Sequence, residues 1–162
     1  PYACGNAWFV EQVRYAANAN EELDALADFD PRYTAVADRR FEQTLHGATL
    51  LQQSPEAHVT LTSYAPNHLV YEAENPHDGV ALFSEIYYPH GWQVTIDGQP
   101  ATLARANYVL RALYLPAGRH TVEMRFDPQS LHTTEGIAYA ATGLLLVGFL
   151  LALFLSLRRK HG

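Results

Sequence analysis

The chain has 162 residues, 48% of them hydrophobic, and a formal net charge of −6. This length is enough for one domain with a substantial core. All seventeen acidic residues lie at or before Glu135, where only eight arginines accompany them and the net charge is −9. A surface this acidic argues against nucleic acid as a partner, because nucleic acid requires clustered positive charge.

Cys4 is the only cysteine, so no disulfide can form within the chain. The start of the sequence shows no export signal with a charged and then an apolar region. We therefore expect the chain to be the end of a longer protein, delivered across the membrane by upstream membrane helices.

The first 54 residues predict a small strand–helix–strand unit, either an α+β subdomain or a flap. Residues 7–15 and 33–37 favour strands, and residues 39–54 favour irregular structure with a helical turn. Asn20 is expected to cap the helix between the two strands, which ends at Asp30 because that residue precedes a proline. The apolar stripe of this helix would consist of Leu23, Leu26, Ala27 and Phe29.

Residues 55–130 predict an antiparallel β-sandwich of the jelly-roll or immunoglobulin-like kind. About seven or eight short apolar runs, rich in Val, Ile, Tyr and Phe, are separated by compact turn signals. Asp97-Gly98 predicts a two-residue type I′ turn, since both of its central residues need positive φ. Pro116-Ala117-Gly118 predicts a second hairpin with a three-residue loop.

These two turns fix the expected strand registers. The first hairpin would pair Ile96 with Gln99, Val94 with Ala101 and Trp92 with Leu103.

The second hairpin would set Arg111 directly across from Glu123, as an ion pair on the outer sheet face. Leu110 and Met124 would then pair on the face that packs into the core.

The C-terminal part predicts one membrane helix over residues 134–157. No charged residue occurs from 136 to 157, and such a run can cross a hydrocarbon core of about 30 Å. The alternative is a buried core helix. The basic tail, residues 158–162, is expected in the cytoplasm and residues 1–133 outside it, in a bacterial cytoplasmic membrane.

The sequence shows no catalytic, metal or cofactor pattern. The eight histidines are scattered without ligand spacing, and no phosphate loop or nucleophile elbow occurs. Two carboxylate pairs, Glu72 with Glu74 and Asp78 with Glu85, have the composition that glycoside hydrolysis uses. Acidic residues at turns and strand edges mostly serve solvation, and we expect that role here.

One aromatic cluster suggests a binding role. Tyr87, Tyr88, His90 and Trp92 surround a proline–glycine turn, where their rings could stack on the faces of a sugar. The alternative for Trp92 is a place in the sandwich core, which large aromatic residues commonly fill.

Several ordered motifs, spread over nearly the whole chain, are similar to the C-terminal end of the YfhO-like bacterial membrane proteins. They are Gly5-Asn6-Ala7-Trp8-Phe9-Val10, Phe29-Asp30-Pro31, Ser84-Glu85-Ile86-Tyr87-Tyr88-Pro89-x-Gly91-Trp92, Ile96-Asp97-Gly98, Asn107-Tyr108-Val109-Leu110-Arg111-Ala112 and Pro116-Ala117-Gly118-x-His120-Thr121-Val122.

This resemblance implies a polytopic membrane protein similar to the GT-C glycosyltransferases, which take a sugar from a polyprenyl-phosphate donor outside the membrane. Their catalytic carboxylate lies in a first extracytoplasmic loop that this sequence does not contain, so no catalytic residue is carried over. The chain would be an accessory domain with the last membrane helix, acting in glycosylation of a cell-envelope glycan or polymer. The alternative is a non-enzymatic, membrane-anchored carbohydrate-binding or assembly module.

Overall fold

A computed structural model of the chain describes residues 3–52, 54–128, 134 and 138–151. The chain divides into two compact units, Pro1–Phe126 and Asp127–Gly162, which are considered separately below.

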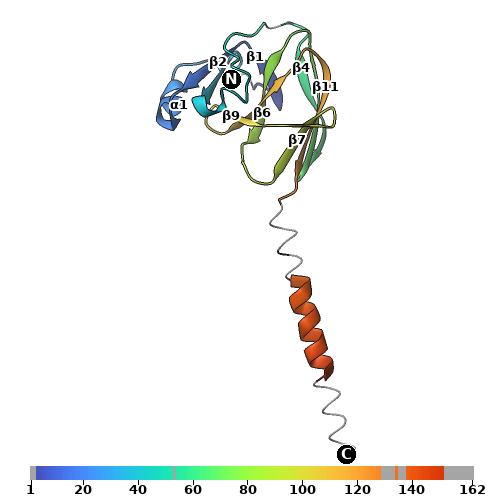
Figure 1. Ribbon diagram of the computed structural model, residues 1–162. Helices are drawn as coiled ribbons and strands as arrows, with labels where there is room; N and C mark the ends of the chain where they lie inside the picture. The colour runs from blue at the N-terminus through green and yellow to red at the C-terminus, as the bar shows by residue number, and fades with distance from the viewer. Residues whose placement is uncertain (1–2, 53, 129–133, 135–137, 152–162) are drawn as a thin grey trace, which may run out of the picture. The chain divides into compact units, whose positions relative to one another are not determined.

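The first unit contains two packed β-sheets, and the predicted mainly β, antiparallel architecture is confirmed (Figure 1). One sheet has six strands. Its strands, in spatial order, are β1 (Ala7–Val10), β6 (Gly79–Ile86), β10 (Leu110–Leu115), β9 (Ala104–Ala106), β3 (Thr34–Asp38) and β2 (Gln12–Ala16).

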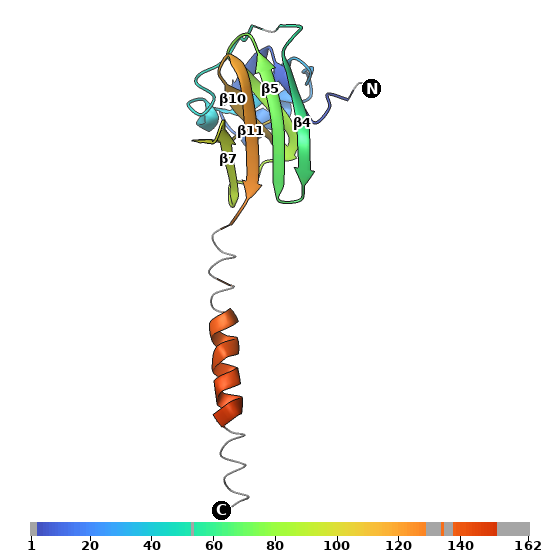
Figure 2. The ribbon, with the colours of Figure 1, turned by 90° about the vertical axis from the view of Figure 1, so that its right-hand side faces the viewer.

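The second sheet has five strands, all antiparallel to their neighbours (Figure 2). They are, in spatial order, β4 (His58–Ala65), β5 (His68–Asn75), β11 (Gly118–Phe126), β7 (Trp92–Ile96) and β8 (Gln99–Ala101). Eight strands, β4 to β11, therefore follow residue 57, as the spacing of apolar runs and turns predicted.

The main core consists of alternate residues from strands of both sheets. Tyr71 on β5 and Phe83 on β6 are both completely buried, and their rings meet edge to face at 4.8 Å. Val122 and Met124 on β11 join the same cluster. The period of two along each strand thus places one apolar face inward, as expected for a sandwich.

The predicted strand–helix–strand unit is present, with β2 and β3 parallel and the helix α1 (Ala19–Ala25) connecting them. The first predicted strand is broken at Glu11, whose amide donates to the Tyr33 carbonyl at 2.8 Å. β1, β2 and β3 are strands of the six-stranded sheet, so the structure shows no boundary between compact units at residue 54. The expected helical turn is a 3-10 helix, Arg39–Phe41.

Three details of the predicted helix were wrong. It ends at Ala25 and does not continue to Asp30. Its cap is Asn18, whose side chain accepts from the amides of Asn20 and Glu21, so the helix begins before Asn20. The buried residue of the helix is Glu22, while Leu23 is 52% exposed. The apolar stripe of the helix was expected to face the core. Glu22 is buried in its place, because its carboxylate finds hydrogen-bonding partners there.

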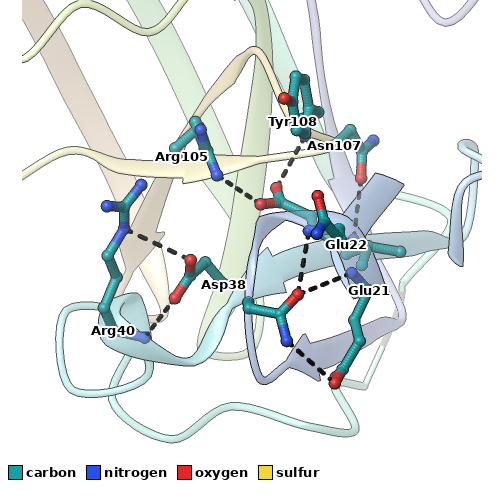
Figure 3. Close-up of polar contacts among 10 residues, drawn as sticks. Glu21, Glu22, Asp38, Arg40, Arg105, Asn107 and Tyr108 are labelled. Carbon is teal, nitrogen blue, oxygen red and sulfur yellow. Dashed lines mark hydrogen bonds and ion pairs between the residues drawn. The ribbon is translucent and has the colours of Figure 1, made fainter. Parts of the chain in front are cut away.

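Those partners come from β9 and from the turn between β9 and β10 (Figure 3). Arg105 Nη2 donates to Glu22 Oε2 at 2.5 Å, and the Tyr108 amide donates to Glu22 Oε1 at 2.8 Å. Both carboxylate oxygens of a fully buried group are therefore satisfied, which a buried charge requires. The contact fastens α1 to the six-stranded sheet.

Asn107 completes the same junction. Its backbone N–H donates to the Val36 carbonyl at 2.6 Å, and its side-chain oxygen accepts from the backbone N–H of Val36 at 2.8 Å. Asn107 and Tyr108 have φ of 48° and 69°, the left-handed region that asparagine tolerates better than most residues. The asparagine side chain thus takes the place of a strand carbonyl beside β3.

The first predicted hairpin is confirmed. Asp97 and Gly98 have φ of 52° and 77°, and β7 pairs with β8 through Ile96–Gln99 and Val94–Ala101. β8 ends at Ala101, so the expected pairing of Trp92 with Leu103 is not formed.

The second predicted hairpin is wrong. β10 pairs with β6 and β9 in one sheet, whereas β11 pairs with β5 and β7 in the other. Residues 116–118 therefore connect the two sheets. Asp78 holds this crossing, since its carboxylate accepts from the Ala117 amide at 2.8 Å and from the Tyr114 hydroxyl at 2.6 Å.

In the second unit, the structure describes a helix over residues 138–151 whose large apolar side chains are exposed. No helix within the described residues is both long and apolar enough to cross a bilayer. The predicted membrane helix, 134–157, lies partly outside those residues.

We predict that Glu22→Ala lowers the free energy of unfolding by about 3–5 kcal/mol, because it leaves the Arg105 cation and the Tyr108 amide without a buried partner. Chemical denaturation in detergent, followed by circular dichroism, measures this. The matched control is Glu21→Ala on the exposed side of the same helix, and an equal loss in both variants would contradict the prediction.

Acid should destabilise the sandwich through Asp97. Its side chain lies 2.6 Å from His120 Nδ1 and accepts from the Thr121 amide at 2.8 Å, and these bonds hold the pKa of Asp97 below its ordinary value. A lowered carboxyl pKa adds stability above the unfolded-state pKa of about 4, and that stability is lost as the pH falls through the folded-state pKa.

Asp97→Asn should therefore show a shallower fall in melting temperature than the parent chain as the pH drops from about 5 to about 2. Asp28→Asn, which removes an exposed carboxylate, serves as the control and should retain the parental slope. Identical slopes for Asp97→Asn and the parent would refute the assignment.

Candidate functional site: an aromatic groove

A groove of about 410 Å³ opens beside the connection from β6 to β7. Three of the four aromatic residues predicted to form a binding cluster, Tyr87, Tyr88 and Trp92, line this groove. The fourth, His90, does not line it. The lining residues are Tyr87, Tyr88, Pro89, Trp92, Gln93, Val94, Thr95, Pro100, Ala101, Thr102 and Leu103.

Trp92 belongs both to this groove and to the core. As the first residue of β7 it is half-buried and packs against the core cluster, opposite Phe126 on β11. The two rings lie 5.3 Å apart with an interplanar angle of 51°. Its position is therefore compatible with both roles considered from the sequence, a place in the core and contact with a sugar.

The tyrosines form the outer part of the groove. Tyr88 is 52% exposed, and its ring meets the exposed His90 ring edge to face at 5.6 Å. Tyr87 is half-buried; its amide donates to the Val109 carbonyl at 2.7 Å and its ring meets Phe41 at 5.6 Å. One exposed ring, Tyr88, thus stands beside two anchored ones.

Arg111 lies behind Trp92 and was not recognised as part of this site. Its guanidinium carbon is 3.9 Å from the centre of the Trp92 ring, a cation–π contact. The side chain is only 3% exposed, and its Nε donates to the Ile86 carbonyl at 3.1 Å. Its Nη1 lies 3.5 Å from the sulfur of Met124 in the facing sheet.

A β-bulge creates the acceptor for Arg111. Leu110 pairs with Ile86, but the next residue, Arg111, pairs with Phe83, so β6 holds two extra residues at this point. Bulges commonly occur where a strand redirects a side chain. Here the irregularity leaves the Ile86 carbonyl available for Arg111.

The predicted ion pair between Arg111 and Glu123 is wrong, because β10 and β11 are not neighbours. Glu123 instead pairs with Arg125 and His68, each at 2.7 Å. Burial lowers the pKa of Arg111, and the nearby Glu85 carboxylate opposes that shift. Arg111 lies inside the sandwich, where its side chain supports the Trp92 ring.

The groove is electrically neutral. None of its lining residues, all within the described part of the chain, carries a charge. Besides the hydroxyls of its tyrosines and the indole N–H of Trp92, its polar side-chain groups are the Gln93 amide and the hydroxyls of Thr95 and Thr102. The Thr95 hydroxyl oxygen is buried without a hydrogen-bond partner. Aromatic rings with neutral hydrogen-bonding groups suit an uncharged, hydroxyl-rich ligand such as a sugar.

One carboxylate of each pair considered for hydrolysis has a structural partner. Glu74 pairs with Arg119 at 2.7 Å, and Asp78 holds the crossing between the sheets. Hydrogen bonds from Tyr114 and the Ala117 amide hold the pKa of Asp78 below its ordinary value. Within the described residues, no three His, Cys, Asp or Glu side chains are grouped closely enough to hold a metal ion.

We predict that Arg111→Ala lowers the free energy of unfolding by about 2–4 kcal/mol, through a lost cation–π contact, an unpaired Ile86 carbonyl and a cavity. In a Trp8→Phe background, the emission of Trp92 should also shift. Arg119→Ala, which removes an exposed arginine, is the control and should leave that emission unchanged. Unaltered stability and emission in Arg111→Ala would contradict the assignment.

A comparison with known families covers the four motifs between Ser84 and Val122, while the motifs at residues 5–10 and 29–31 lie outside the match. A model of the family described as "Bacterial membrane protein YfhO" matches residues 42–138, more than half of the chain. The searches of curated proteins and of solved structures gave no match. The matched region runs from the end of the 3-10 helix through the whole series β4 to β11 and includes every residue of the aromatic groove. The chain therefore belongs to the YfhO family of bacterial membrane proteins.

Proposed function

We propose that this chain is the extracytoplasmic C-terminal accessory domain, with the last membrane helix, of a glycosyltransferase-like membrane protein that acts on a cell-envelope glycan or polymer. In this proposal the sandwich binds sugar in the aromatic groove, and the catalytic residues lie in the upstream part of the protein. The partners are a glycan or a polyprenyl-linked sugar, the upstream membrane helices and the lipid bilayer.

The observation that carries the proposal is the composition of the groove. Tyr88 offers an exposed ring, and Trp92 offers a ring that packs against Arg111 and Phe126. The apolar faces of a sugar ring can stack on such aromatic rings, and neutral hydroxyl and amide groups can hydrogen-bond its hydroxyls. A phosphate or other anion would find no cationic partner among the lining residues.

The membrane part of the proposal is supported by the family and by residues 138–151. The family consists of bacterial membrane proteins. The described helix exposes apolar side chains along its length, which a bilayer would cover; they are Leu144, Leu145, Leu146, Val147, Phe149, Leu150 and Leu151. We propose that residues 134–157 form the membrane helix, with residues 1–133 outside and 158–162 in the cytoplasm.

A second candidate function is a non-enzymatic, membrane-anchored carbohydrate-binding or assembly module. The groove favours this reading equally, because it contains binding groups and no supported acid, base or nucleophile. The two candidates differ in whether removal of the sandwich abolishes sugar transfer by the full-length protein.

We predict that neutral oligosaccharides change the fluorescence of Trp92 in a Trp8→Phe chain, and that Tyr88→Ala weakens binding about tenfold by removing one stacking ring. Tyr64→Ala, which also removes an exposed tyrosine but lies outside the groove, is the matched control. Equal affinity in both variants, or no response to a panel of hexose and N-acetylhexosamine oligomers, would contradict the sugar site.

The topology predicts that a reporter active only in the cytoplasm works when it is fused after Gly162. A reporter active only outside the cytoplasm should remain silent at the same position. The reverse pattern would overturn the proposed orientation.

A further inference from the structure

Four large apolar side chains are exposed at one end of the sandwich. They are Tyr64 near the β4–β5 turn, Ile86 at the end of β6, Tyr88 in the β6–β7 connection and Val109 in the β9–β10 turn. Their exposed fractions are 68%, 72%, 52% and 46% in that order. We call this set the apolar rim.

Strand pairing places these segments together. Leu110 pairs with Ile86, and the Tyr87 amide donates to the Val109 carbonyl, so the β9–β10 turn lies beside the end of β6. In the other sheet, the Phe126 amide donates to the Asn67 carbonyl at 2.8 Å in the turn after Tyr64. Figures 1 and 2 show the β4–β5 turn, the β6–β7 connection and the end of β11 at the same end.

This is also the end from which the chain leaves the sandwich. β11 ends at Phe126, where Trp92 pairs with it, and the sequence continues directly into the unit that contains the apolar helix 138–151. The chain belongs to a family of bacterial membrane proteins, so a lipid bilayer is an apolar partner available to exposed apolar groups at this end.

We propose that the apolar rim contacts the surface of the lipid bilayer and inserts its side chains at the level of the headgroups. Tyrosine is enriched at this level because its ring is apolar and its hydroxyl is polar, while Ile86 and Val109 supply aliphatic surface. Exposed apolar groups gathered at one end of a domain commonly mark an interaction surface.

The charges beside the rim indicate that the contact is apolar rather than electrostatic. His68, Glu123 and Arg125 form one mixed cluster beside the end of β11, and Glu85 adds a further carboxylate. The chain before the C-terminal basic cluster carries a net charge of −9, so anionic lipid does not attract it. Anionic lipid should therefore not strengthen the contact of the rim with the bilayer.

The inference does not depend on the sugar site, because only Tyr88 belongs to both surfaces. It can be tested with the other three rim residues, which leave the groove intact.

The test uses the whole chain in vesicles of phosphatidylcholine, with or without phosphatidylglycerol. Spin labels are placed by Tyr64→Cys, Ile86→Cys and Val109→Cys in a Cys4→Ser background. Leu50→Cys is the matched control, because Leu50 is 80% exposed and lies at the opposite end of the sandwich. Leu50 pairs with Gln12, which follows β1, and the end of β1 at Val10 pairs with the start of β6 at Val80. Collision with oxygen, which concentrates in lipid, is compared with collision with a water-soluble nickel complex.

The proposal expects the ratio of oxygen to nickel accessibility to be severalfold higher at the rim labels than at Leu50→Cys, in both vesicle types. Ile86→Ser combined with Val109→Ser should lower the ratio at the Tyr64→Cys label. Equal ratios at the two ends would overturn the proposal. Rim labels shielded from both reagents would also overturn it, because they would show a protein partner in place of lipid.

Discussion

The packing of Arg111 against Trp92 is the interaction on which the candidate site depends. Arg111 lies on the same face of β10 as Leu113 and Leu115, whose side chains are in the core, so the strand period places its guanidinium inside the sandwich. Burial of a cation is unfavourable unless it finds partners. The Ile86 carbonyl, the Met124 sulfur and the Trp92 ring supply them, and the last of these contacts fixes a wall of the groove.

A second buried charge attaches the helix α1 to the six-stranded sheet, beside β2 and β3. Glu22 fastens α1 through Arg105 and the Tyr108 amide, and Asn107 closes the gap beside β3. Both junctions use the turn between β9 and β10, which also contacts Tyr87 through Val109. The small strand–helix–strand unit and the groove are thus connected through one short turn, and neither is an appendage of an independent sandwich.

The sequence predicted the strands after residue 57 and the turn of the first hairpin correctly, because these features follow from local pattern and turn chemistry. Three of the four aromatic residues that it singled out line one groove. Asp97-Gly98 determines both its turn type and its register. Residues 116–118 determine only a change of direction, and local chemistry does not specify which sheet the next strand joins. For the same reason Arg111 was paired with the wrong residue and missed as the support of Trp92. Glu22 was missed because its partners are more than eighty residues away.

Saturation-transfer NMR tests the sugar site most directly. With the whole chain in detergent and a bound neutral oligosaccharide, irradiation of the aromatic protons should transfer saturation to ring protons on one apolar sugar face. The same experiment with Tyr88→Ala should weaken that transfer, while Tyr64→Ala should leave it unchanged. Transfer that is absent, or equally strong in all three chains, would contradict a sugar site in the aromatic groove.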